Sequence, residues 1–249
     1  MDWVLLFIVF LVGLGTTFIG AISGGGGLLM RPILIFLGVP TITLIGTPRV
    51  AGILGDWPGL FLFHKHKKID WNLAIFLTIP NLIGTIIAGM VVISLPTEAL
   101  ELFLGILLIV SGVVFSFNKN FGLLEQKSPF SKIGQNILGF IGTNVISFVG
   151  TITGGLGTLY ISFYTLIYGK NYINAAGLWR ISSYFGGLGS SVVFIWSGIV
   201  DWQLCLVLSA GFLIGSYFGT IYGLKKGVAR VRYLVIALAF GAGIKLILF

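Results

Sequence analysis

The feature that most constrains this chain is a run of four glycines inside an apolar stretch, Ser23-Gly24-Gly25-Gly26-Gly27. A second cluster, Thr153-Gly154-Gly155-Leu156-Gly157, follows about half a chain later. Adjacent glycines lose backbone entropy on folding and leave peptide groups uncovered, which a lipid-facing helix does not tolerate. Such backbone persists at membrane depth only where protein buries it or where it lines a wet cavity. The clusters therefore predict helices broken at matching positions of two halves, a pattern typical of transporter binding sites.

The composition indicates an all-α polytopic membrane protein. Of 249 residues, 57% are hydrophobic and only 9% are charged, whereas about a quarter of a soluble domain is charged. The formal net charge of +8 sits mostly in loops, as in membrane proteins, and does not indicate a nucleic-acid partner. Cys205 is the only cysteine, which excludes a disulfide, and His64 and His66 lack further ligands. We therefore expect no metal and no cofactor.

Ten apolar segments can be marked along the chain. They cover about 3–22, 28–38, 41–63, 71–94, 98–117, 133–153, 157–168, 172–198, 202–223 and 229–249. Segments 28–38 and 157–168 are too short for a full crossing of about 20 residues. Each follows a glycine cluster, so each should form a broken pair with the segment before it. Whether a pair spans twice or enters and returns stays open at this point.

Basic residues gather in loops on one face of this ten-segment arrangement. They are Lys65, Lys67, Lys68, Lys119, Lys127, Lys132, Lys170, Lys225, Lys226, Arg230 and Arg232, whereas the opposite face carries Asp2, Glu98 and Asp201. Because cytoplasmic loops are enriched in lysine and arginine, the basic face is predicted to be cytoplasmic and both termini to lie outside.

The two halves of the chain repeat. Residues 19–25 align with 149–155, Arg49 aligns with Arg180, and Asp70-Trp71 aligns with Asp201-Trp202. Five segments per half is an odd number, so the halves should have opposite topology. We predict a first repeat over 1–117, a cytoplasmic linker over 118–132 and a second, inverted repeat over 133–249, with the site between them near the midplane.

Arg49 and Arg180 are the sharpest candidate binding residues. Both fall in the first third of long apolar segments, where an arginine is costly and normally faces the bundle interior with a partner. Two guanidiniums brought toward a common centre would suit a small oxyanion. The alternatives, a structural ion pair or a side chain that reaches the interface, remain open.

Further candidates lie close to these arginines and glycines. Asp56 follows Arg49 by two helical turns and is a candidate ion-pair or coupling residue. Free amides where the short helices begin, together with nearby hydroxyls, would accept an anion. The additional candidate substrate-binding residues are Ser23, Gly24, Gly25, Gly26, Arg31, Thr153, Gly154 and Gly155.

These motifs resemble those of the sulfite exporter TauE/SafE family, also called the toluene-sulfonate uptake permease family. The resemblance rests on Ser23–Pro32, on the weaker copy Thr153–Gly157 and on the length and repeat of the chain. In the second copy, Leu156 interrupts the glycine run and Ser162 replaces the proline. The resemblance implies transport of sulfite, sulfoacetate or another organosulfonate across a prokaryotic cytoplasmic membrane.

We therefore expect a secondary transporter for a small sulfur-containing oxyanion, working by alternating access. The expected partners are the small anion and the lipid bilayer, with protons as a candidate coupling ion and a homo-oligomer left open. The alternatives are an anion-selective channel, which needs the same residues, and a thiosulfate- or sulfate-type importer, although a lone Cys205 supplies no cysteine relay. A membrane enzyme is not expected, because no nucleophile–base pair or cofactor motif is present.

Overall fold

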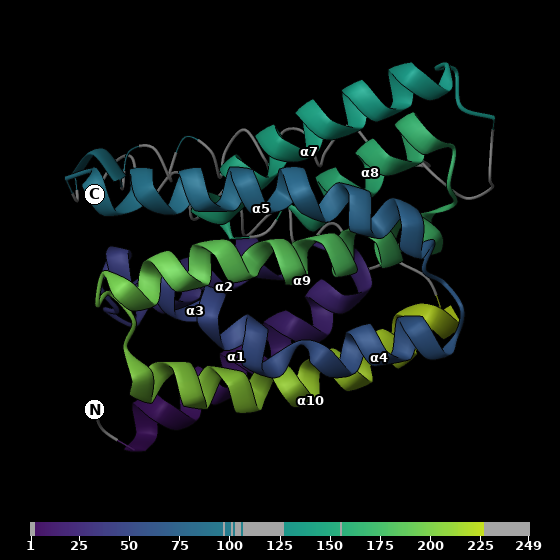
Figure 1. Cartoon of the computed structure of the whole chain (residues 1–249). Coiled ribbons are helices and arrows are strands. Elements are labelled where there is room, and N and C mark those ends of the chain that lie inside the picture. Colours follow the sequence, from purple (N-terminus) through teal and green to yellow (C-terminus); the bar gives the residue numbers. More distant parts are fainter. Residues whose placement is uncertain are drawn as a thin grey trace.

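A computed structural model of the chain describes residues 3–96, 98–100, 102, 106, 127–154 and 156–226. This part is helical, without strands, which confirms the all-α prediction (Figure 1). Its helices are α1 (Trp3–Ser23), α2 (Gly26–Phe36), α3 (Thr41–Gly55), α4 (Trp57–Lys65), α5 (Trp71–Ser94), α7 (Lys132–Thr153), α8 (Gly157–Tyr168), α9 (Tyr172–Trp196) and α10 (Trp202–Lys226). The predicted segment 229–249 and most of segment 98–117 lie outside the described residues.

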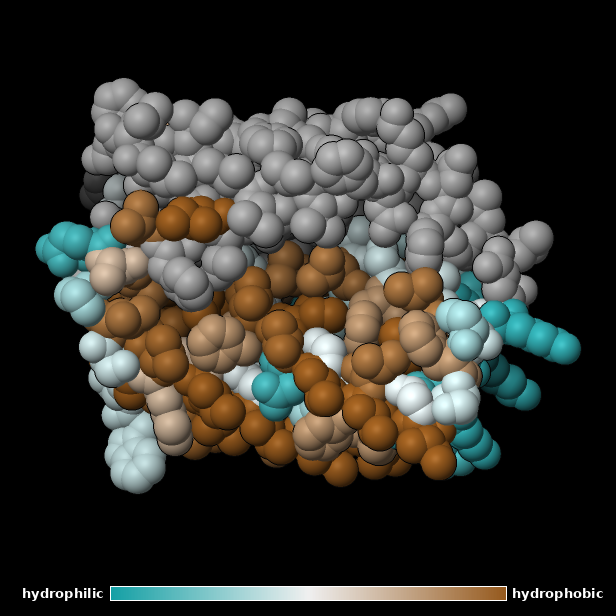
Figure 2. All heavy atoms as spheres, turned by 90° about the horizontal axis from the view of Figure 1, so that it is seen from above, coloured by the Kyte–Doolittle hydropathy of each residue, from teal (hydrophilic) through white to brown (hydrophobic). Residues whose placement is uncertain are grey.

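The surface is that of a multi-pass membrane protein. Within the described ranges, α1, α5, α7 and α10 are long and apolar enough to cross a membrane. Large hydrophobic side chains face outward along them, for example Phe7 in α1 and Ile75 in α5, which are 61% and 60% exposed. Figure 2 shows the resulting apolar belt between two polar ends. Lipid, rather than water, is the solvent that such a belt requires.

The two glycine clusters form the turns of two helical hairpins. In Figure 1, α1 starts at the left end of the bundle and α2 returns to it, whereas α7 starts at the right end and α8 returns there. Each turn contains a glycine with positive φ, +77° at Gly24 and +82° at Gly154, a backbone region that glycine adopts without strain. Both short helices therefore turn back toward the end where their hairpin began.

The tips of the hairpins touch each other. A Cβ on Gly24 would lie 2.5 Å from the amide nitrogen of Thr158 in α8, and a Cβ on Gly154 would meet the guanidinium of Arg31 in α2. The irregular backbone of each turn is thus covered by the other hairpin, as membrane depth requires.

The main helix contacts cross between the predicted halves. Helices α1 and α3 of the first half pack on α10 of the second, and α7 and α9 of the second half pack on α5 of the first. The helices α2 and α8 each pack on the helix that follows them. These pairs correspond when the halves are exchanged, but the inverted relation of the complete repeats stays a prediction.

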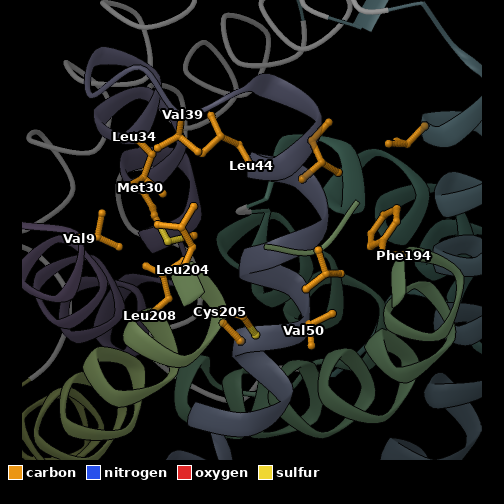
Figure 3. Close-up of a cluster of buried hydrophobic side chains, with 14 of the residues drawn as sticks. Val9, Met30, Leu34, Val39, Leu44, Val50, Phe194, Leu204, Cys205 and Leu208 are labelled. Atoms are coloured by element: carbon orange, nitrogen blue, oxygen red, sulfur yellow. The ribbon is translucent and has the colours of Figure 1, made fainter. Parts of the chain in front are cut away.

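A buried apolar cluster joins the first hairpin to the rest of the bundle (Figure 3). Val9 of α1, Leu34 of α2, Leu44 of α3 and Leu208 of α10 are each at most 1% exposed within it. Cys205 lies in the same cluster and is fully buried. The cluster fixes the position of α2, whose N-terminal end carries candidate binding residues.

The basic loops share one end of the bundle. The α4–α5 loop, the start of α7, the α8–α9 loop and the end of α10 all lie on the right in Figure 1. These segments carry Lys65, Lys67, Lys68, Lys127, Lys132, Lys170, Lys225 and Lys226. Lys119, Arg230 and Arg232 lie outside the described residues.

The repeated Asp-Trp pairs mark helix starts. The amide of Leu73 donates to Asp70 Oδ1 at 3.3 Å at the start of α5, and the amide of Leu204 donates to Asp201 Oδ1 at 3.0 Å at the start of α10. Only Asp70 of the two also forms an ion pair with Lys170 Nζ, at 3.0 Å. Partial burial alone would raise the pKa of Asp70, but the hydrogen bonds from Lys170 and Leu73 and the charge of Lys170 outweigh it and lower the pKa.

The turn geometry predicts a difference between two glycines of positive φ. Gly38 has open space around its Cβ position, so Gly38→Ala should lower the free energy of unfolding by about 1 kcal/mol, the cost of a left-handed L-residue. Gly24→Ala should cost about 3 kcal/mol, because its Cβ also displaces the backbone of α8. Unfolding of detergent-purified variants measures both, and equal costs would contradict the contact between the hairpin tips.

The two aspartate caps form a second matched pair. Asp201→Ala should cost about 1 kcal/mol for the lost cap. Asp70→Ala should cost a few tenths of a kcal/mol more, because the partly exposed ion pair with Lys170 is also lost. Because the folded-state pKa of Asp70 is lowered, the stability it contributes is present above its unfolded-state pKa and is lost as the pH falls through the folded-state value. Unfolding measured over acidic pH, with Lys170→Met as the control that keeps the cap, tests this, and pH-independence of the Asp70→Ala effect would contradict it.

Candidate functional site

A cavity of about 190 Å³ lies where the hairpin tips meet the long helices. The described helices that line it are α1, α2, α3, α4, α7, α8, α9 and α10, and both predicted halves therefore contribute. An engineered cavity of about 150 Å³ holds one benzene molecule, so this space admits a molecule of about six heavy atoms or slightly more.

Most of the predicted site residues meet at this cavity. Those that line it are Gly24, Gly26, Arg31, Arg49, Asp56, Gly154 and Arg180. Gly25 and Thr153 do not line it, and the Thr153 hydroxyl donates instead to the carbonyl of Val149 at 3.1 Å. Gly155 and the side chain of Ser23 lie outside the described part of the chain.

Arg49 projects from α3 onto α9. Its Nε donates to Ser190 Oγ at 3.0 Å, and its guanidinium carbon would lie 3.2 Å from a Cβ on Gly187. Glycine at position 187 therefore lets the guanidinium lie close to the α9 backbone. This hydrogen-bond partner is an uncharged hydroxyl, which does not neutralise the charge of Arg49.

Arg180 projects from α9 onto α4 and α10. Its Nη1 donates to Ser216 Oγ at 3.2 Å and lies 3.9 Å from Asp56 Oδ1. The guanidinium carbon also lies 5.7 Å from the ring centre of Phe63 and 5.9 Å from that of Trp179, distances at which the rings attract a cation. Arg180 is 7% exposed, and its Nε has no hydrogen-bond partner among the described residues.

The two arginines have reciprocal surroundings. Arg180 lies against positions 56 and 59 of the first half, where a Cβ on Gly59 would collide with its Nη1. Arg49 lies against positions 187 and 190 of the second half, which are the repeat counterparts of 56 and 59. Each repeat-equivalent arginine thus packs on the equivalent part of the opposite half.

Arg31 in α2 supplies a third cation. It is 3% exposed, and its Nη2 donates to the carbonyl of Thr151 in α7 at 2.9 Å. Its Nε and Nη1 have no hydrogen-bond partner in the described structure. Because its repeat counterpart is Ile161, this cation breaks the symmetry of the site. Buried guanidinium groups normally have their donors paired, so these two unpaired donors set Arg31 apart.

Asp56 marks a break that the sequence analysis missed. Segment 41–63 was expected to be one helix, but α3 ends at Gly55 and α4 begins at Trp57. Pro58 explains the break, because proline has no amide to continue the helical bonding and its ring clashes with the preceding turn. The carbonyl of Asp56 accepts bonds from the amide of Gly59 at 3.1 Å and from Ser216 Oγ at 3.3 Å. The break places the Asp56 carboxylate on the cavity wall.

The short helices start at the cavity without side-chain caps. Neither Gly25 before α2 nor Leu156 before α8 provides a capping side chain, and Gly26 and Gly157 line the cavity. The positive ends of both helix dipoles therefore face this space, which favours an anion there.

Two tyrosines at the cavity were also missed. Tyr160 lines it and accepts a bond from Asn81 Nδ2 at 3.1 Å, and Tyr184 lines it while donating to the carbonyl of Ile53 at 2.9 Å. The spacing of Tyr160, Tyr164 and Tyr168, one every four residues, was the available signal. Their rings lie in sequence along α8, with centres 5.8 and 6.1 Å apart.

Comparison with known proteins agrees with this architecture. A model of the family described as "Sulfite exporter TauE/SafE" matches residues 9–246. The "Probable membrane transporter protein ORF9" of a Sinorhizobium species is 21% identical over 248 residues, which cover 98% of this chain and 92% of the relative. A probable membrane transporter protein of Haemophilus influenzae is 25% identical over 238 residues, covering 95% and 92%. The Escherichia coli K12 protein YfcA, also named as a probable membrane transporter, is 25% identical over 255 residues, covering 98% and 90%.

No solved structure shows a significant match to the chain. The family match nevertheless spans both hairpins and every described residue that lines the cavity. The relatives carry transporter names, in agreement with the expectation that this chain is not an enzyme. The chain is a membrane transporter and belongs to the sulfite exporter TauE/SafE family.

Proposed function

We propose that the chain is a secondary carrier for a small sulfur-containing oxyanion, such as sulfite, sulfoacetate or another organosulfonate. The observation that carries this proposal is the set of three arginines, Arg31, Arg49 and Arg180, around one small cavity. Guanidinium groups bind planar or tetrahedral oxyanions through paired N–H donors. The name of the family supplies the sulfur chemistry.

The proposed transport mechanism is alternating access between two inverted halves. The hairpins enter from opposite ends and meet at the cavity, and Arg49 and Arg180 each lie on the opposite half. A movement of one half against the other would change which end of the cavity is closed while both arginines stay near the anion. We further propose that the lysine-rich end faces the cytoplasm of a prokaryotic cell, with both termini outside.

Replacement of the paired arginines tests the binding site. Arg49→Gln and Arg180→Gln should each reduce the uptake of radiolabelled sulfite into proteoliposomes by about tenfold to a hundredfold, because each removes a charge-assisted contact. The double variant should be inactive. The exposed Lys225→Gln is the matched control, which removes a positive charge far from the cavity and should leave uptake unchanged.

Two results would contradict this account. Unchanged uptake by folded double variant would show that the anion binds elsewhere. Single-channel currents in a planar bilayer would show that the protein is an anion-selective channel and not a carrier. Saturable uptake that is accelerated by anion on the opposite side of the membrane would support the carrier.

Asp56 is the proposed site of coupling to protons. Its carboxylate is the one acidic group among the described residues that line the cavity, and it lies 3.9 Å from Arg180 Nη1. An anion that binds Arg180 competes with Asp56 for the same cation. The Asp56 carboxylate then lies close to the negative charge of the bound anion, and this repulsion favours protonation of Asp56.

Asp56→Asn should separate binding from coupling. The variant should bind anion at least as tightly as the natural chain, because a competing negative charge is gone, but uptake should no longer respond to an imposed pH gradient. Binding to purified protein and uptake with and without the gradient measure the two effects. A variant that keeps its response to the gradient would exclude Asp56 as the coupling group.

A further inference from the structure

The charges around the cavity do not balance. The described lining contains three arginines, Arg31, Arg49 and Arg180, but only one carboxylate, Asp56. Asp56 lies 3.9 Å from Arg180, whereas in the described structure Arg49 donates to a hydroxyl and Arg31 to a carbonyl, both uncharged. Two positive charges are therefore left without a negative partner in the described lining.

Such an imbalance is costly inside a membrane protein. An uncompensated buried charge is destabilising unless a counter-charge or water reaches it. The hydrogen-bond donors of these arginines are also incompletely paired. Arg31 Nε, Arg31 Nη1 and Arg180 Nε have no hydrogen-bond partner among the described residues. Arg31 and Arg180 are only 3% and 7% exposed, so bulk solvent reaches little of either side chain.

We propose that the cargo is a compact dianion and that Arg31 is the residue that selects two negative charges over one. This inference rests on the proposed function and specifies the charge of its substrate. Arg49 is common to both halves by repeat, whereas Arg31 has Ile161 as its counterpart and is the added charge. Without Arg31 the described lining would be matched to a monoanion.

The position of Arg31 suits this role. Its Thr151 contact fixes one end of the guanidinium to α7, and its Nε edge lies against the Gly154 turn. Arg31 lines the same cavity as Arg49, and its Nη1 has no hydrogen-bond partner among the described residues. A cavity of about 190 Å³ holds an inorganic sulfur dianion or a short sulfonate that also carries a carboxylate, but not an aromatic sulfonate.

Sulfate and methanesulfonate provide a matched pair of probes. Both have tetrahedral sulfur and similar size, but methanesulfonate has a methyl group in place of one oxygen and carries one charge fewer. We expect purified wild-type protein to bind sulfate at least about tenfold more tightly in calorimetry or thermal-shift titration, because the added charge interacts with buried cations.

Variants at position 31 identify the residue responsible. Arg31→Gln should reduce the preference for sulfate over methanesulfonate at least about tenfold, whatever it does to the affinity for each probe. Arg31→Lys is the control, because it loses the forked donors but keeps the charge, and it should keep most of the preference. A purely structural role of Arg31 would change both affinities equally and leave the ratio unchanged.

The outcomes separate this inference from the proposed function. Equal binding of the two probes overturns the dianion inference even if anion uptake is intact. A preference that survives Arg31→Gln overturns the selecting role of Arg31. Absence of any anion uptake by reconstituted wild-type protein overturns the proposed function as well. If Arg31→Gln does not fold, Asp56→Asn replaces it: removal of the one carboxylate should increase the preference for sulfate, and a decrease would overturn the inference.

Discussion

The structure depends on one constraint: the non-helical backbone inside the membrane must be covered by other parts of the protein. Four helices, α1, α2, α7 and α8, end or begin within the bundle and leave amides and carbonyls without partners in their own helix. Each hairpin covers the exposed backbone of the other. The Gly24 turn packs on the start of α8, and the Gly154 turn packs on Arg31 of α2. Side chains at either glycine would separate the tips. The contact between the tips covers the backbone of both turns, and the cavity lies where these tips meet the long helices.

The packing of the helices also determines where the buried arginines lie. Arg49 and Arg180 cross from one half to the other, and small residues such as Gly59 and Gly187 let them lie close to the opposite helix. Each guanidinium donates to a serine hydroxyl, and of the two only Arg180 also has a carboxylate nearby in the described structure, that of Asp56. An arginine at membrane depth is costly, and its presence at both repeat-equivalent positions supports the proposal that the charge binds the transported anion.

Much of this arrangement could be predicted from the sequence, because its strongest signals are local. Apolar length predicted the ends of most described helices within a few residues, segment 41–63 excepted, and the glycine clusters identified both hairpin turns. The intramembrane arginines were identified by the cost of placing them there, and the structure brings them to one cavity. Two side-chain placements were not predictable in the same way: Thr153 bonds to Val149 one turn earlier in α7, and Tyr184 of α9 bonds to the carbonyl of Ile53 in α3. Both depend on helix rotation, which hydrophobic length does not encode.

The break at Asp56 was the clearest failure within the described helices. Pro58 was visible in the sequence, but prolines also occur within continuous helices here, as Pro48 does in α3 and Pro80 in α5. The position of Pro58 differs from those of Pro48 and Pro80 by a tertiary contact. The Ser216 hydroxyl of α10 donates a hydrogen bond to the carbonyl of Asp56 and supports the interrupted backbone. The sequence alone gave no means to identify that partner.

This break has a mechanical consequence. The counterpart of α3 and α4 in the second half is α9, which runs unbroken from Tyr172 to Trp196. A helix that is interrupted bends most easily at the interruption, whereas a continuous helix of 25 residues moves as one rigid element. In the proposed alternating-access cycle, the motions at the two ends of the cavity should therefore be unequal, with bending concentrated beside Asp56 and rigid tilting in α9.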